Sequence, residues 1–147
     1  MATTAKSRTT PVHLWAVGIF ALLWNAFGCY DYLMTVTANQ AYLSHYPPEI
    51  MAYVNGLPAW LTAMWAIGVW GGLAGSFALL ARRRLAVWLF GISALGAIIG
   101  LGYEMLMTDQ PASMTSGAMA VMPYAAIALA LFFLWYAFSE EQKGLLR

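Results

Sequence analysis

The sequence predicts an all-α, polytopic membrane protein: a four-transmembrane-helix bundle whose N and C termini both lie in the cytoplasm. Three observations lead to this prediction. Charged residues make up only 9% of the 147 residues and hydrophobic residues 62%, whereas about a quarter of a soluble domain is charged. Four continuous apolar stretches are each long enough to cross a bilayer as a helix. The basic residues fall into three short clusters outside those stretches.

The basic residues predict the orientation of the chain. The three clusters are Lys6 and Arg8, then Arg82, Arg83 and Arg84, then Lys143 and Arg147. If every stretch crosses the membrane, all three clusters fall on one side, which is the cytoplasmic side by the positive-inside rule. The three consecutive arginines are therefore predicted topology anchors. Basic residues are too few to form a nucleic-acid surface, so we expect the lipid bilayer as the partner and no nucleic acid.

The first span is predicted over about residues 14–36, since a bilayer core needs roughly 20 helical residues. A bacterial lipoprotein signal ending in Ala26-Phe27-Gly28-Cys29 is the alternative, in which Cys29 is lipidated after cleavage. Phe27 is too bulky for such a site, and the apolar run continues through Leu33 and Met34. We therefore expect a retained helix. A single cysteine also excludes an intrachain disulfide.

The loop after this span, residues 37–57, is the longer of the two on the outer side. Its first half contains no proline or glycine, so the first helix is expected to continue to about His45. Pro47 and Pro48 then stop it, and Pro48 can open a short helix through Tyr53, because proline is tolerated in a first turn. The aromatic residues favour a cap lying on the bundle and headgroups; the alternative is a lid or a partner-docking surface.

The second and third spans, about residues 58–81 and 85–107, carry small residues spaced four apart. These predicted packing positions are Gly68, Gly71, Gly72 and Gly75, followed by Gly96 and Gly100. Such GxxxG spacing removes side-chain bulk from one helix face, so that another backbone can approach closely. The spacing does not distinguish packing within one chain from a homo-oligomer or a larger membrane complex.

The fourth span is predicted over about residues 119–138, after a turn-rich connector at residues 109–117. Tryptophans near predicted span ends fit the headgroup level, where an amphipathic ring is favoured. They are Trp15, Trp60, Trp88 and Trp135. One domain, residues 1–147, is therefore predicted.

Asn25, Asp31 and Glu104 are the candidate polar residues within the spans. A carboxylate in a membrane is costly, so it should face the bundle interior or water and have a partner. Both acids are predicted toward the outer side, where the chain has no Lys or Arg. Hydroxyls, amides or water must therefore solvate them, or they are partly protonated. We hypothesise that they line an outward-facing cavity for a small solute; the alternative is that they hold the helices in register.

Neither a cofactor, a metal site nor a catalytic site is expected, so the chain is not predicted to be an enzyme. His13 and His45 are predicted on opposite sides of the membrane, which excludes bis-histidine haem ligation. The sequence has no metal-ligand spacing, phosphate loop or nucleophile elbow.

Two stretches resemble a family of small proteobacterial four-helix inner-membrane proteins that often carry the description "sugar transporter". They are residues 22–32, LLWNAFGCYDY, and residues 58–72, PAWLTAMWAIGVWGG. The similarity extends over the intervening loop and the turn at residues 82–84, and Cys29 stands where a small residue such as alanine is expected. The resemblance implies a bacterial inner (plasma) membrane protein that transports or binds a small solute such as a sugar. The alternative is a non-catalytic accessory or assembly subunit that packs against a larger membrane complex.

Overall fold

The computed structural model describes residues 9–147, and all regular secondary structure in that range is helical. The predicted basic residues Lys6 and Arg8 lie outside the described residues. Four of the helices are long and apolar enough to cross a membrane, namely α1, α4, α5 and α6. The bounds are α1 (Val12–Val36), α2 (Gln40–Leu43), α3 (Pro48–Gly56), α4 (Ala59–Leu80), α5 (Leu85–Met107) and α6 (Gly117–Gln142). The predicted all-α architecture with four membrane-length helices is confirmed.

The predicted spans match these helices closely, and the largest difference is in α6. This helix runs from Gly117 to Gln142 rather than from 119 to 138. Hydropathy identifies only the apolar part of a helix. The helix itself can extend into water, because its backbone hydrogen bonds can form there too. The polar residues 139–142 therefore extend α6 beyond its apolar segment.

The prediction that the first helix continues to His45 is wrong. Helix α1 ends at Val36, and Ala38 adopts a left-handed conformation with φ 52°. Asn39 follows, and its side chain accepts a hydrogen bond from the backbone N–H of Tyr42 at 3.0 Å, which caps the short helix α2. An asparagine that can cap a new helix competes with continuation of the old one. The absence of proline and glycine was therefore insufficient evidence for a continuous helix.

The short helix expected after the two prolines is present as α3. Pro47 is extended, with ψ 140°, and Pro48 occupies the first turn, where its missing N–H costs no hydrogen bond. The helix continues past Tyr53 to Gly56. The chain between α1 and α4 is thus two short helices joined by a turn.

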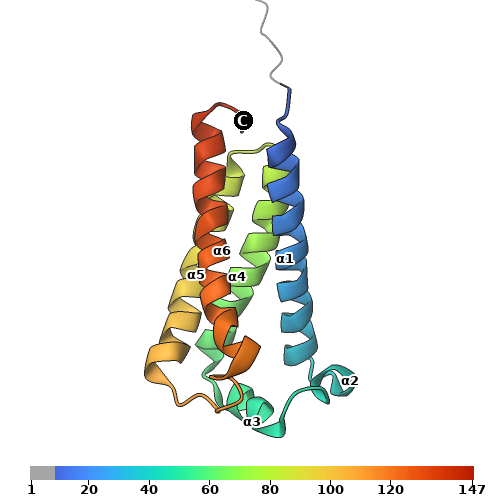
Figure 1. Ribbon diagram of the computed structural model, residues 1–147, viewed down its shortest axis with the longest axis vertical. Helices are drawn as coiled ribbons and strands as arrows, with labels where there is room; N and C mark the ends of the chain where they lie inside the picture. The colour runs from blue at the N-terminus through green and yellow to red at the C-terminus, as the bar shows by residue number, and fades with distance from the viewer. Residues whose placement is uncertain (1–8) are drawn as a thin grey trace, which may run out of the picture.

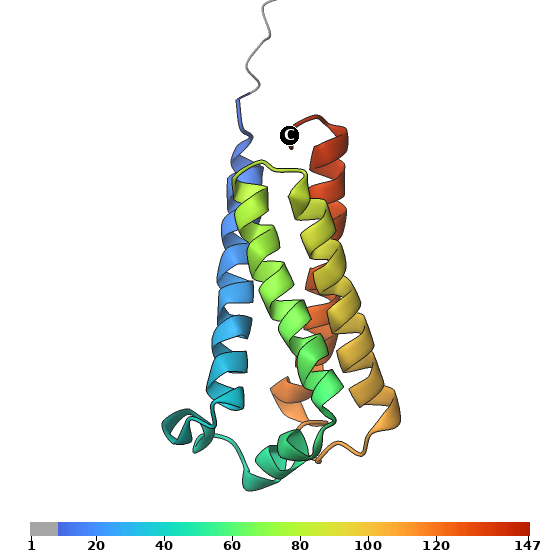
Figure 2. The ribbon, with the colours of Figure 1, turned by 180° about the vertical axis from the view of Figure 1, so that it is seen from behind.

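The four long helices form an up-and-down bundle (Figures 1 and 2). The most extensive contacts join α4 with α5, α1 with α4, and α5 with α6. The start of α1, the turn at residues 81–84 and the last residues of the chain meet at one end, which we call the basic end (Figure 1). Helices α2 and α3 and the connector at residues 108–116 lie at the opposite end, which we call the loop end.

The buried apolar cluster lies toward the basic end. Its members come from the first turns of α1 and α5 and the last turns of α4 and α6, together with the segment after α6. They are Leu14, Ala21, Ala78, Leu79, Ala86, Phe90, Phe133, Tyr136, Ala137, Leu145 and Leu146. Phe90 of α5 and Phe133 of α6 pack with ring centroids 5.7 Å apart. Close packing at this end therefore joins all four long helices.

The segment after α6 folds back onto the turn between α4 and α5. Gly144 reverses the chain with φ 73°, a conformation that glycine adopts without steric cost. The backbone N–H of Arg147 then donates to the carbonyl of Arg82 at 2.8 Å, and the N–H of Arg84 donates to the backbone oxygen of Arg147 at 3.1 Å. These two bonds hold the basic end closed over Leu146, which is buried.

Candidate functional site

Asp31 is hydrogen-bonded to a tyrosine of the loop end. It lies in the last turns of α1 and is half-buried. The hydroxyl of Tyr42, on α2, donates to Asp31 Oδ1 at 2.6 Å. The hydroxyls of Tyr42 and Tyr46 are 3.2 Å apart. Because the only hydroxyl proton of Tyr42 is directed to the carboxylate, Tyr46 must be the donor in that second bond.

Glu104 contacts a different tyrosine. The hydroxyl of Tyr53, on α3, lies 3.3 Å from Glu104 Oε2 and 2.7 Å from Thr108 Oγ1. Thr108 directs its own proton to the carbonyl of Glu104 at 2.6 Å. Thr108 therefore accepts from Tyr53, which leaves the longer contact to the carboxylate as the weaker branch of a shared bond.

Tyr42 and Tyr53 supply hydroxyl contacts to these acids, which is one of the alternatives that the sequence left open. Each acid is paired with a different short helix, so the two contacts tie α2 to α1 and α3 to α5. A third bond, from Ser113 Oγ to Glu49 Oε1 at 2.5 Å, ties the connector before α6 to α3. These bonds connect the loop end to α1 and α5.

Both tyrosines remain proton donors under ordinary conditions. Burial, and next the hydrogen bond to Asp31, raise the pKa of Tyr42 well above its ordinary value of 10.0. Burial also raises the pKa of Tyr53, although its hydrogen bond with Thr108 acts in the opposite direction. A deprotonated hydroxyl could not donate to a carboxylate, so these shifts preserve the two contacts.

We expect Tyr42→Phe to loosen α2. Removing a partly buried hydrogen bond to a carboxylate costs about 1 kcal/mol, so the amides of α2 should exchange with solvent roughly fivefold faster at pH 8. Because the folded-state pKa of Tyr42 is raised, the contact stabilises α2 fully below pH 10.0, and this stabilisation falls progressively as the pH rises from 10.0 through the raised pKa of the folded state. Hydrogen exchange followed by mass spectrometry measures both effects.

Tyr30→Phe is the matched control for this experiment. The ring of Tyr30 packs against Tyr42 with centroids 5.5 Å apart, and the substitution keeps that ring contact. Equal exchange rates in Tyr42→Phe and Tyr30→Phe would show that the bond to Asp31 does not hold α2.

Asn25 is separate from the two acids and packs between α1 and α4. It is only 7% exposed, and its Nδ2 donates to the carbonyl of Ala21 at 2.8 Å. Ser76 Oγ lies 3.5 Å from the same nitrogen. A Cβ added to Gly72 would lie 2.0 Å from Asn25 Oδ1, so this amide fills the space that the glycine leaves.

The glycines predicted to pack helices contact neighbouring helices of the same chain. Gly68, Gly71 and Gly75 face α5, whereas Gly72 faces α1. From α5, a Cβ on Gly96 would meet the backbone of α4 at 2.9 Å, and one on Gly100 would meet Met64 at 3.2 Å. Ser93 adds a bond between the same two helices, from its hydroxyl to the carbonyl of Gly68 at 2.6 Å.

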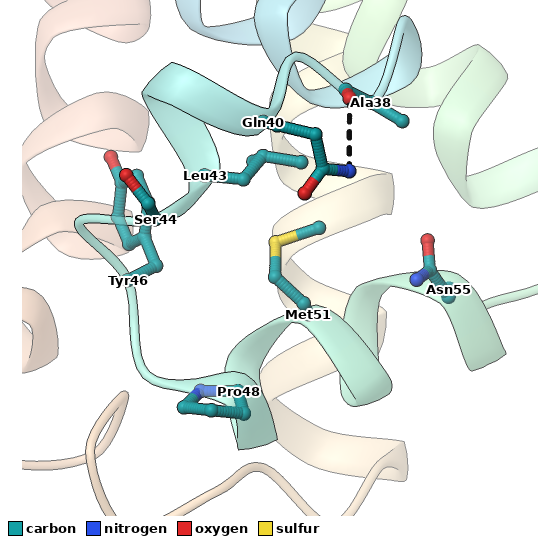
Figure 3. A pocket seen from close by; sticks show the side chains of 8 residues that line it. All are labelled: Ala38, Gln40, Leu43, Ser44, Tyr46, Pro48, Met51 and Asn55. Carbon is teal, nitrogen blue, oxygen red and sulfur yellow. Dashed lines mark hydrogen bonds between the residues drawn. The ribbon is translucent and has the colours of Figure 1, made fainter.

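A depression of about 380 Å³ lies between α2 and α3 at the loop end. Figure 3 shows the Met51 side chain reaching toward Gln40, whose amide donates to the carbonyl of Ala38 at 3.4 Å. The lining is uncharged: Ala38, Gln40, Leu43, Ser44, Tyr46, Pro48, Met51 and Asn55. Asn25, Asp31 and Glu104 are not among these residues, so the hypothesised polar cavity and this depression are different places.

The basic end holds polar contacts that the sequence did not indicate. Glu140 is fully buried, and Lys143 Nζ lies 2.7 Å from its Oε1. Its Oε2 has no hydrogen-bond partner among residues 9–147. His13 Nδ1 contacts the hydroxyl of Tyr136 at 2.5 Å. The i,i+3 spacing of Glu140 and Lys143 is a sequence signal for their ion pair, whereas the burial of Glu140 is evident only in the folded structure.

Within residues 9–147, no three His, Cys, Asp or Glu side chains are grouped so that they could hold a metal ion. His13 lies at the basic end and His45 at the loop end. Cys29 is buried in α1. No protein-family model, no curated protein and no solved structure matches this chain.

Proposed function

We propose that the protein is a small multi-pass protein of the bacterial inner membrane that acts as a non-catalytic accessory or assembly subunit of a larger membrane complex. In this proposal its basic end, and both termini, face the cytoplasm. The observation that supports this proposal is that the polar side chains within the spans contact other residues of the same chain. Asn25 is buried against Gly72, Asp31 is bonded to Tyr42, and Glu104 lies by Tyr53. These contacts lie within the chain, so in this proposal the three side chains stabilise the bundle and do not bind a solute.

The exposed face of α6 supports the same proposal. Of the four long helices, α6 has the smallest buried share of its most apolar segment. Exposed residues on it, at positions 121, 124, 128, 131, 135 and 138, follow one another at alternating spacings of three and four, which places them in one stripe. The large members of this stripe are Val121, Tyr124, Leu131, Trp135 and Phe138. Such a stripe suits a partner helix that packs against it in the membrane.

Purification from native membranes in a mild detergent tests this proposal. We expect a membrane protein to co-purify in fixed proportion with the chain, and Tyr124→Leu with Trp135→Leu to release it. The matched control is Trp70→Leu, because Trp70 is 42% exposed on α4 and lies outside the stripe. A clean homodimer or monomer from native membranes would exclude the accessory role.

Transport or binding of a small solute is the second candidate. It is favoured by the resemblance described above and by the two acids at the loop end, each bonded to a tyrosine on a short helix. Opening of α2 or α3 would free a carboxylate for a proton or a solute hydroxyl. The test is proton-coupled uptake of sugars by proteoliposomes, which Asp31→Asn with Glu104→Gln should abolish. Uptake that equals that of empty liposomes would exclude this candidate.

A further inference from the structure

We propose that the basic end holds the phosphate group of an anionic phospholipid, between the turn that joins α4 to α5 and the segment that follows α6. The site consists of Arg83, Arg84 and Arg147, with Leu85 and Trp88 as its apolar border. This inference is independent of the proposed accessory role, because it concerns the bilayer itself.

The fold brings these three arginines together from distant parts of the sequence. Arg83 and Arg84 lie in the turn before α5, and two backbone hydrogen bonds hold Arg147 beside that turn. Leu145 and Leu146 are buried beneath it, so the segment is anchored by packing as well. The guanidinium groups are therefore attached to a backbone that is already ordered, which lowers the entropy cost of binding an anion.

The charges at this end are not balanced within the described residues. Five cationic side chains lie in the turn and in the C-terminal segment, against two carboxylate side chains, those of Glu140 and Glu141. The five are Arg82, Arg83, Arg84, Lys143 and Arg147. Lys143 pairs with Glu140, and Arg84 Nε lies 3.8 Å from Glu141 Oε1. Arg83 and Arg147 form no ion pair with residues 9–147. The positive charge of Arg83 and Arg147 is therefore available to bind an anion from outside the chain.

The third arginine of the turn has a different role. Arg82 adopts a left-handed conformation, with φ 55°, and its Nη1 donates to Thr10 Oγ1 at 2.6 Å. This bond joins the turn to the segment before α1. Arg82 is therefore a structural contact, and the site is assigned to its two neighbours and Arg147.

The surroundings of the cluster favour a lipid over a soluble anion. Helix α5 begins directly after Arg84, and both Leu85, 56% exposed, and Trp88 lie in its first turns. An exposed indole at the end of a membrane-length helix suits the boundary between headgroups and acyl chains. The first turn of α5 contains no acidic residue that would repel an anion. A phosphate joined to hydrocarbon matches both parts of this surface.

The test uses the full chain in uncharged detergent micelles, titrated with phosphatidylglycerol or with phosphatidylcholine and examined by native mass spectrometry. We expect selective retention of phosphatidylglycerol. Each arginine near an anionic lipid contributes about fivefold to binding, so Arg83→Gln with Arg147→Gln should weaken retention about 25-fold. Arg83→Lys with Arg147→Lys keeps the charge and should retain most of it.

Glu141→Gln provides a variant with the opposite expected effect. It removes the carboxylate that lies near Arg84, so it should strengthen phosphatidylglycerol retention while the bundle stays folded by circular dichroism. Inorganic phosphate should not displace the lipid at equal concentration, because it lacks the hydrocarbon that Leu85 and Trp88 contact. Equal retention of both lipids, displacement by inorganic phosphate, or no response to the double glutamine variant would overturn the proposal.

Discussion

Gly96→Ala is expected to destabilise the bundle by about 1–3 kcal/mol, the usual cost of overpacking a close contact. The added methyl would lie 2.9 Å from both the backbone nitrogen of Gly68 and the carbonyl oxygen of Met64. Backbone atoms inside a helix cannot move singly, so α4 and α5 would have to separate along their contact. The bond from Ser93 to the carbonyl of Gly68 would lengthen with them. Unfolding in mixed micelles, followed by circular dichroism, measures the loss.

Gly102→Ala is the matched control on the same helix. A methyl at Gly102 would meet no atom within 4 Å, and alanine favours a helix over glycine by up to about 1 kcal/mol. The control should therefore unfold at the same denaturant concentration as the parent chain or at a higher one. If Gly96→Ala behaved like Gly102→Ala, the close approach of α4 and α5 at this point would be wrong.

Gly72→Ala should destabilise the bundle by about 1–2 kcal/mol through a different mechanism. Its methyl would lie 2.0 Å from Asn25 Oδ1, which is the end of a side chain and can rotate away. The rotation would cost the bond from Asn25 to the carbonyl of Ala21 and leave a polar group buried between α1 and α4.

A double-mutant cycle isolates this pair. In Asn25→Ala the space beside Gly72 is empty, and the added methyl of Gly72→Ala can fill part of it. The double variant should therefore be more stable than the two single effects predict by about 1 kcal/mol, the coupling expected for residues in contact. Additive effects in the same unfolding assay would show that Asn25 and Gly72 do not contact each other.

The spans were predictable because the membrane imposes a local rule. In lipid every backbone group must be bonded within its own segment, so an apolar run of sufficient length must be a helix. Val36 was therefore the correct end of α1 by hydropathy. The expected continuation to His45 was wrong because Asn39 can either continue α1 or cap a new helix. Hydropathy carries no information on that choice.

The sequence did not indicate which neighbouring helix each glycine faces. Residues four apart on a helix differ by about 40° around its axis, so Gly68 and Gly72 can face different neighbours, and they do. The same holds for the acids. For Asp31 the sequence left a hydroxyl, an amide, water or partial protonation as alternatives, since no cation was available, and only the folding of α2 against α1 selects Tyr42.

Composition and the spacing of apolar residues were sufficient to establish four membrane-length helices in this chain, because each helix is a local response to lipid. The burial of Glu140, the placement of Arg147 beside Arg84 and the separation of Asp31 from Glu104 were decided by tertiary structure. Arg84 and Arg147 are far apart in the sequence but adjacent in the fold, whereas Asp31 and Glu104 are both acids but have different partners. Such contacts depend on how the helices rotate and how the connecting segments fold back, and no local pattern encodes either.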